Sequence, residues 1–147
     1  MMDYTATYPT STTVDERVKE FISAFYAISD DPSRDNEWVD CFTPDAFITL
    51  GDRQAKGTEE IREFRKGMGE RVKSQTHKVE KVFPAAFESS EPEPKWRFEY
   101  MLHGSVDIEL KSAGKATGQW AARAILVDHE GRLKYKFYQV YLHTQPV

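Results

Sequence analysis

Residues 96–143 read WRFEYMLHGSVDIELKSAGKATGQWAARAILVDHEGRLKYKFYQVYLH. Aromatic and β-branched residues dominate three runs of this stretch, and short groups rich in Gly, Ser, Asp and Lys separate the runs. Such runs predict β-strands joined by tight connections, with neighbouring strands paired antiparallel. The expected strands are 96–110, 116–127 and 132–143, and the expected turns are 111–115 and 128–131.

The residues before this sheet have helical spacing instead. Thr13 and Glu16 are spaced as an N-terminal capping box, and apolar residues then recur every three or four positions as far as Asp30. The other expected elements are a helix at 34–42, a strand at 46–50, a helix beginning at Gly57 and a strand at 77–83. Helices that precede a run of antiparallel strands predict an α+β fold. We expect about three N-terminal helices to close the mouth of a curved, cone-like sheet and leave a pocket.

The chain has 147 residues, which is typical of one domain. Residues 1–12 are polar and rich in Thr, Ser and Pro, so we expect a flexible tail followed by a single domain at 13–147. Residues 88–95 (ESSEPEPK) predict an acidic loop between two strands. Aromatic residues make up 13% of the chain, a surplus that often lines a ligand cavity or an oligomer interface.

The charge and hydropathy of the chain exclude several classes of protein. The net charge is −4 with both signs interspersed, which argues against a nucleic-acid partner. No apolar run is long enough to span a bilayer, and the N-terminus lacks the features of a secretory signal, so a cytoplasmic location is expected. Cys41 is the only cysteine, which rules out an internal disulfide.

Pairing the expected strands about their turns divides the sheet into two faces. The more apolar face, which we assign to the core, carries Leu102, Gly104, Val106, Ile108, Trp120, Ala122, Ala124, Leu126, Leu133, Tyr135, Phe137, Gln139 and Tyr141. The other face carries Met101, His103, Ser105, Asp107, Gln119, Ala121, Arg123, Ile125, Lys136, Tyr138 and Val140. A single β-bulge would exchange these faces along part of a strand.

Several strings of the sequence carry a family resemblance. They are FYAISDD (25–31), FTPDAFITLGDRQAKGTEEIREFRKGM (42–68), THKVEKVFP (76–84), MLHGSVDIEL (101–110), WAARAILV (120–127) and YQVYL (138–142). With this order of elements they resemble the SnoaL-like branch of the nuclear transport factor 2-like superfamily, and more closely small fungal SnoaL-like proteins. The resemblance implies the cone-like α+β fold. It leaves activity open, because the superfamily includes isomerases, dehydratases, cyclases and epoxide hydrolases as well as members that only bind or dimerise.

The resemblance also implies site residues. His77 and His103 are placed similarly to the two pocket histidines of scytalone dehydratase, and Tyr26 is the nearest match to its tyrosines. Where ketosteroid isomerase has an acid on the penultimate strand, this chain has Arg123, which puts stabilisation of an enolate by a neutral acid in doubt.

The residue types suggest roles for these and other positions. His77 suits general acid–base catalysis because imidazole titrates near neutral pH, although a half-solvated histidine at a strand start is the structural alternative. Arg123 can either polarise a substrate carbonyl or form an ion pair with Asp107 that supports a dimer. The predicted catalytic residues are His77, Tyr141 and Arg123. The predicted substrate-binding residues are Trp38, Tyr26, His103, Trp120, Phe137 and Tyr138, the last of which matters if the register slips; each aromatic residue is otherwise plain core.

No spacing of His, Cys, Asp and Glu resembles a metal site, and no glycine-rich phosphate loop occurs, so no cofactor is expected. We therefore expect a cofactor-independent cyclase, isomerase or dehydratase that acts on a small hydrophobic secondary metabolite of polyketide or terpenoid type. The alternative is a non-catalytic small-molecule-binding or dimerisation domain. A homodimer is expected under either hypothesis, and a pocket without convergent polar groups would favour the second.

Overall fold

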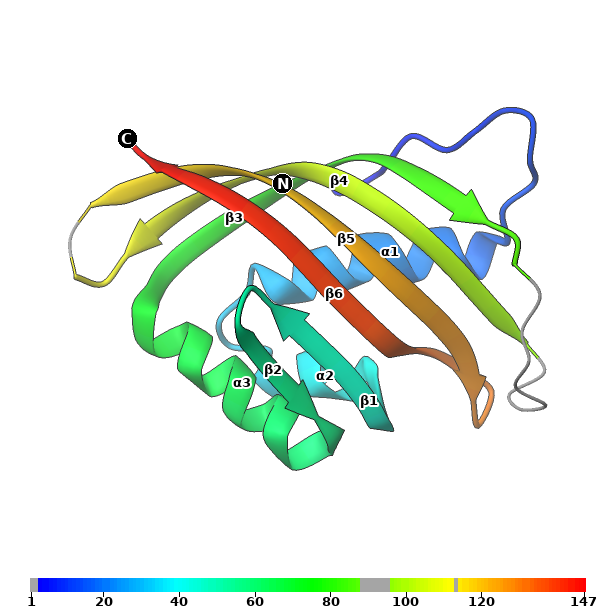
Figure 1. Ribbon diagram of the computed structural model, residues 1–147, viewed down its shortest axis with the longest axis horizontal. Helices are drawn as coiled ribbons and strands as arrows, with labels where there is room; N and C mark the ends of the chain where they lie inside the picture. Colours follow the sequence, from blue (N-terminus) through cyan, green and yellow to red (C-terminus); the bar gives the residue numbers. More distant parts are fainter. Residues whose placement is uncertain (1–2, 88–95, 113) are drawn as a thin grey trace.

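The computed structural model describes residues 3–87, 96–112 and 114–147, so the predicted acidic loop lies outside the described residues. Figure 1 shows long curved strands that arch over the helices, which lie on the concave side. The helices are α1 (Glu16–Ser29), α2 (Asp35–Asp40) and α3 (Gly57–Arg71). The strands are β1 (Phe42–Leu50), β2 (Arg53–Lys56), β3 (Val72–Ala85), β4 (Arg97–Leu110), β5 (Lys115–His129) and β6 (Arg132–Pro146). The α+β prediction is confirmed.

The described strands form one sheet in the order β2-β1-β6-β5-β4-β3. Neighbours pair antiparallel except for β1 and β6, which pair parallel. The sequence did not predict β2, whose four residues carry little apolar periodicity. Its pairing with β1 depends on a tight turn in which Gly51 has a φ of 61°, a conformation that glycine adopts without steric cost.

Helix α1 supplies the centre of the core. The helix begins two residues later than expected: Asp15, and not Thr13, is the N-cap, and its carboxylate accepts the Arg17 backbone N–H at 2.8 Å. Val18, Ile22 and Phe25 recur at helical spacing and are fully buried under the sheet. The apolar stripe predicted from the sequence therefore packs as expected.

A bulge in β6 changes the predicted faces of the sheet. Ile125 pairs with Phe137 but Leu126 pairs with Tyr135, so β6 has one extra residue at this point. Tyr135 and Tyr138 consequently both lie inside, while Phe137 faces outward, where its ring stacks on that of Phe47. The faces predicted for β4 and β5 are correct along most of their length, but the assignment of Phe137, Gln139 and Tyr141 to the inner face is wrong.

Gly104 lies in β4, between β3 and β5, and its lack of a side chain allows both neighbouring strands to pack closely against β4. It lies opposite Trp120 and next to a second irregularity in the register, between Val79 and Lys81 of β3. A Cβ added at Gly104 would overlap the Lys78 carbonyl oxygen and come within 2.9 Å of the Trp120 ring. The absence of a side chain here lets the Trp120 indole pack closely against β4.

The N-terminal segment is anchored at residues 4–8, which differs from the expectation of a flexible tail over 1–12. Thr7 forms a parallel bridge with Lys81 of β3, and Ala6 is buried. The composition of this segment gave no sign of the bridge, because backbone pairing needs no particular side chain. The boundary of the single domain at residue 13 stays a prediction. Within the described residues, no helix has the length and apolar character needed to cross a membrane.

Candidate active site

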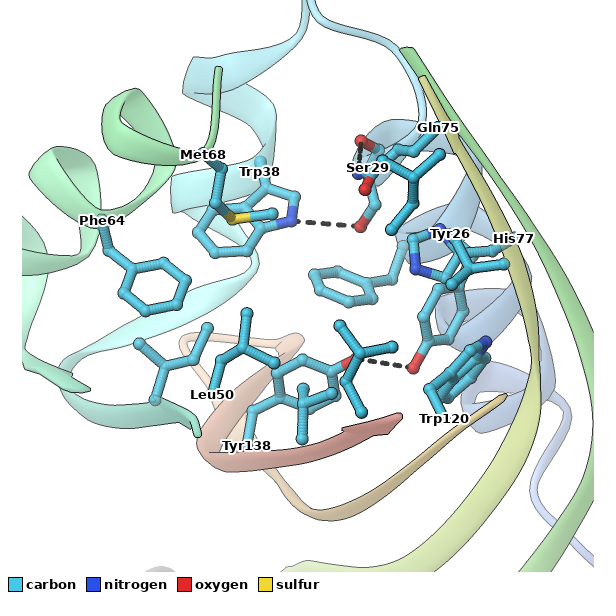
Figure 2. Close-up of a pocket in the computed structure, with 16 residues that line it drawn as sticks. Tyr26, Ser29, Trp38, Leu50, Phe64, Met68, Gln75, His77, Trp120 and Tyr138 are labelled. Atoms are coloured by element: carbon cyan, nitrogen blue, oxygen red, sulfur yellow. Dashed lines mark hydrogen bonds between the residues drawn. The ribbon is translucent and has the colours of Figure 1, made fainter. Parts of the chain in front are cut away.

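A cavity lies between the inner face of the sheet and the helices, and Figure 2 shows the side chains around it. It offers about 90 Å³ to the centres of water molecules, where one water needs roughly 10–15 Å³, so it has room for one compact ligand. The walls are mainly aliphatic and aromatic, and polar groups gather at the end nearest α1. Among the predicted substrate-binding residues, the structure brings four into this wall: Tyr26, Trp38, Trp120 and Tyr138.

His77 of β3 and Asp30 at the C-terminal end of α1 form a hydrogen-bonded pair. The His77 ring atom Nδ1 lies 2.5 Å from Asp30 Oδ1, and Asp30 Oδ2 accepts the His77 backbone N–H at 2.7 Å. A carboxylate at Nδ1 keeps the ring proton on that nitrogen and leaves Nε2 as a proton acceptor. Because His77 lines the cavity, this arrangement suits a general base.

Asp30 was not among the site residues predicted from the sequence, although the sequence carries a signal for it. Tyr26 and Asp30 are four residues apart around the end of α1, so they lie on the same face of the helix. Both lie on the side that faces β3, where His77 was already a candidate. Searching the helix end for a carboxylate partner of His77 would have identified Asp30.

Tyr26 and Tyr138 place two hydroxyl groups beside this pair. Their oxygens are 2.7 Å apart, and both side chains are buried. Burial raises the pKa of Tyr26, and also that of Tyr138, well above the ordinary value, so both hydroxyls stay protonated near neutral pH. Whichever hydroxyl donates to the other, the acceptor retains a proton that it can donate to a ligand. The Tyr26 ring centroid is 5.3 Å from that of His77, so base and donor lie together.

The two tryptophans act as walls, because their N–H groups are already bonded. Trp120 Nε1 donates to the Ser105 carbonyl oxygen at 2.9 Å, and Trp38 Nε1 donates to Ser29 Oγ at 3.1 Å. The Trp120 ring packs against both Tyr26 and His77, with centroid distances of 5.0 and 5.6 Å. These contacts shield the base from water on one side.

A buried arginine holds the end of α1 in place. Arg65 of α3 donates to the carbonyl oxygens of Ser29 and Asp31 at 3.1 and 3.0 Å, and its Nε donates to Asp35 Oδ1 at 2.7 Å. Gln75 Nε2 also donates to the Ser29 carbonyl oxygen, at 3.0 Å. A cation at a helix C-terminus satisfies carbonyls that lack partners within the helix. These bonds hold the backbone on both sides of Asp30, so the position of its side chain is fixed.

Four predicted site residues lie outside the cavity. Tyr141 and Phe137 face outward because of the bulge in β6, and Tyr141 is 50% exposed. Arg123 Nε donates to Glu99 Oε2 at 2.8 Å on the outer face, and its predicted partner Asp107 instead accepts from Thr117. His103 also lies on this face, with its ring 5.9 Å from that of Phe83. The assignments of Tyr141, Arg123, His103 and Phe137 to the pocket are wrong.

No group of three or more His, Cys, Asp or Glu side chains in the described residues is arranged to hold a metal ion. Cys41 is partly buried, and burial raises the pKa of its thiol to about 12, so the protonated form dominates near neutral pH. The arrangement that remains is a base, a pair of neutral hydroxyl donors and apolar walls. Such groups can move a proton on a ligand and stabilise an oxygen that becomes negative.

Comparisons with known proteins agree with this fold. The pattern of the SnoaL-like domain matches residues 11–144. Curated protein sequences give no significant match to the chain.

Solved structures resemble the chain over most of its length. A protein from Novosphingobium aromaticivorans named as a candidate aromatic ring hydroxylase has a TM-score of 0.78 at 16% identity, covering 90% of this chain and 92% of its own. A candidate scytalone dehydratase from the same organism has a TM-score of 0.76 at 11% identity, covering 90% and 86%. The LinA-type3 hexachlorocyclohexane dehydrochlorinase of Novosphingobium barchaimii has a TM-score of 0.73 at 11% identity, covering 90% and 88%. At these identities the similarity establishes the fold and no particular reaction.

Proposed function

Because the chain belongs to the SnoaL-like domain family, we propose that it is a cofactor-independent enzyme that isomerises, cyclises or dehydrates a small hydrophobic metabolite of polyketide or terpenoid type. The observation that carries this proposal is the His77–Asp30 pair, because His77 lines a cavity whose walls are mainly apolar. A partly buried histidine with a carboxylate partner is a frequent general base, and a purely structural histidine needs no cavity.

The geometry supports a proton transfer in two steps. His77 Nε2 takes a proton from a carbon next to a carbonyl group of the substrate, and Asp30 stabilises the imidazolium that forms. The electron pair of the broken C–H bond moves onto the carbonyl oxygen, which accepts a hydrogen bond from the Tyr26–Tyr138 pair. In an isomerisation, the electron pair shifts through a neighbouring C=C bond and the imidazolium returns its proton to the carbon at the far end of that bond. In a cyclisation, the enolate carbon forms a bond to a second carbonyl carbon of the substrate, and the imidazolium protonates the alkoxide that results. In a dehydration, the electron pair forms a new C=C bond while the β-hydroxyl group takes the proton of the imidazolium and leaves as water.

The walls of the cavity favour a neutral ligand. None of the cavity-lining residues in the described part of the chain is Asp, Glu, Lys or Arg. A carboxylate or phosphate on the ligand would lose its hydration here without gaining a cationic partner. The ligand class that fits is a compact ketone or hydroxyketone with one oxygen near the tyrosine pair.

Deuterium exchange tests the proposal without knowledge of the natural substrate. The purified protein is incubated in D₂O with a panel of cyclic and aromatic ketones and β-hydroxyketones, and exchange at the carbon next to the carbonyl, or elimination of water, is followed by NMR. We expect catalysed exchange on at least one ketone, and its loss in His77→Gln and Asp30→Asn. The matched controls are His103→Gln and Arg123→Ala, which change only the outer face. Catalysis that persists in His77→Gln, or no catalysis by the wild-type protein on the whole panel, would overturn the proposal.

The outer face supports a second proposal, a homodimer. Phe83 and Met101 are paired residues of β3 and β4, and their side chains are 54% and 42% exposed. Together with the exposed Tyr141 they give this face apolar surface of the kind that marks an interaction site. Sedimentation of the wild-type protein and of Met101→Lys tests it: we expect a dimer that the charge dissociates. A dimer without catalysis on the ketone panel would favour a binding or dimerisation domain. The cytoplasmic location expected from the sequence stays a prediction.

A further inference from the structure

The segment at residues 3–8 lies along β3, which is the strand that carries His77. The Thr7 N–H donates to the Glu80 carbonyl oxygen at 2.8 Å, and the Val82 N–H donates to the Thr7 carbonyl oxygen at 3.0 Å. Ala6 is 8% exposed, and the Ser23 hydroxyl of α1 donates to the Tyr4 carbonyl oxygen at 3.4 Å. Backbone pairing, burial and a contact with α1 thus fix the path of this segment.

The segment delivers one hydroxyl group to the candidate site. Tyr4 donates a hydrogen bond to Asp30 Oδ2 at 2.9 Å, on the same oxygen that accepts the His77 backbone N–H. Burial first, and then the hydrogen bond to Asp30, raises the pKa of Tyr4 to about 12, so near neutral pH Tyr4 acts as the donor of this bond. The Asp30 side chain is only 7% exposed, which leaves little room for water to replace a missing donor.

We propose that Tyr4 is a positioning residue of the Asp30–His77 pair, and that docking of the N-terminal segment on β3 completes the site. The effect of Tyr4 on catalysis rests on the proposed function, but its role in holding Asp30 and His77 in place does not. Tyr4 lies outside residues 11–144, the part of the chain that matches the SnoaL-like domain, so the domain pattern does not supply this contact.

Three hydrogen bonds hold the Asp30 carboxylate in place. Asp30 Oδ1 serves the His77 ring, and Oδ2 has two donors, the His77 backbone and Tyr4. With both oxygens occupied, the carboxylate plane is fixed and directs the imidazole towards the cavity. The Tyr4 donor also withdraws part of the carboxylate's negative charge. Without it, Asp30 stabilises the imidazolium more strongly, and His77 becomes a stronger base that is protonated up to a higher pH.

Other ionisable groups lie near the Asp30–His77 pair and also affect how His77 responds to pH. On α1, Tyr26 faces the His77 ring. On the side towards α2 and α3, Asp35, Arg65 and Lys73 line a second small cavity that Asp30 also borders. Arg65 is engaged by Asp35 and by backbone carbonyls. None of these groups is altered by a change at Tyr4, so a shift in that variant reports the Tyr4 contact.

The test compares Tyr4→Phe with Tyr8→Phe in the full-length protein. Tyr8 is the matched control because its hydroxyl, although buried, has no hydrogen-bond partner among the residues that the structure describes. The ring C–H signals of the histidines are titrated by NMR, and His77 is assigned by its absence in His77→Gln. We expect the His77 midpoint to rise by about 0.5 pH unit or more in Tyr4→Phe and to stay unchanged in Tyr8→Phe. Thr7→Pro, which removes the donor to Glu80, undocks the segment and gives the same shift.

Activity on the ketone panel separates this inference from the proposed function. If the enzyme is active, we expect kcat to fall about tenfold in Tyr4→Phe with KM little changed, and the acidic limb of its pH profile to move upward with the NMR midpoint. A shifted midpoint without any catalysis by the wild-type protein would support the positioning role and overturn the proposed function. An unchanged midpoint in Tyr4→Phe, with the Thr7 amide still protected from exchange, would overturn the positioning role alone.

Discussion

The inner and outer faces of the four long strands carry the same kinds of side chain in different surroundings. On the inner face, His77 is hydrogen-bonded to a buried carboxylate and Tyr138 to a buried hydroxyl. On the outer face, His103 lies against Phe83, and Tyr141 is half exposed. A histidine and a tyrosine occur on both faces, so residue type does not distinguish them.

The difference lies in desolvation and in the partner. Hydrogen bonds and charge interactions become stronger where water is excluded, and a group with a fixed partner presents one tautomer in one direction. Only His77 has both, because α1 brings Asp30 against it from the concave side. The helices, rather than the strands, therefore turn one face of the sheet into a candidate site.

The largest expected effect is a loss of folding stability at high pH, caused by the buried tyrosines of the inner face. Burial raises the pKa of Tyr26, Tyr100 and Tyr135 well above 10, and that of Tyr138 as well. The unfolded chain loses these protons near pH 10 while the folded chain keeps them, so this contribution to stability is present below about pH 10 and is lost above it. Each such tyrosine costs about 1.4 kcal/mol per pH unit, and the four together cost on the order of 5 kcal/mol at about pH 11.

Denaturant unfolding between about pH 8 and pH 11, followed together with tyrosinate absorbance, measures this effect. We expect the tyrosinate signal of the buried groups to appear together with unfolding. In Tyr100→Phe, the slope of stability against pH should fall by about 1.4 kcal/mol per pH unit, because one of the buried groups is gone. Gradual formation of tyrosinate by these groups in a protein that remains folded would contradict a closed inner face.

The two histidines give the next largest contrast. His77→Gln should lower kcat/KM on a reactive ketone about 100-fold or more, since general base catalysis contributes roughly 10²–10⁴-fold. His103→Gln should leave kcat/KM within about twofold. Equal losses in the two variants would show that the inner position of His77 has no special role.

The sequence predicted most of the fold and about half of the site. The errors in the site arise mainly from β6. Helical and strand periodicity are local, so α1 and the faces of β4 and β5 were predictable. The bulge between Tyr135 and Phe137 depends on the pairing with β5, which no local pattern encodes, and it reversed the positions of Tyr138 and Tyr141. Asp30 and Tyr4 were missed for a related reason: their function arises from contacts between segments more than 25 residues apart.

The two arginines compare a buried cation with a surface cation. Arg65→Ala removes the donors to Ser29 and Asp31 and leaves buried carbonyls without partners, so we expect a loss of about 2–4 kcal/mol in the free energy of unfolding. Arg123→Ala breaks a half-exposed pair with Glu99 and should cost about 1 kcal/mol or less. Urea unfolding of both variants measures the two costs. A larger loss in Arg123→Ala would show that the outer ion pair matters more than the support of α1.

Two glycines test how tightly the inner face is packed. Gly104→Ala brings a methyl group against the Lys78 carbonyl and the Trp120 ring, so we expect a loss of about 1–3 kcal/mol in stability. Gly69→Ala, in α3, meets nothing within 4 Å and should gain up to about 1 kcal/mol from helix propensity. Thermal unfolding and Trp fluorescence of both variants check this. Unchanged stability in Gly104→Ala would mean that β3 can move away from β4.

The smallest contrast is between the two tyrosines that the bulge exchanged. Tyr138→Phe keeps the ring but removes one member of the 2.7 Å hydroxyl pair, so Tyr26 alone remains to donate to the substrate oxygen. We expect kcat to fall about tenfold and stability to fall by about 1 kcal/mol, since one buried hydrogen bond is lost. Tyr141→Phe should change neither quantity, because its hydroxyl lies on the outer face. If the two variants behaved in the opposite way, β6 would have the regular alternation that the sequence suggested, and the bulge would not exist in solution.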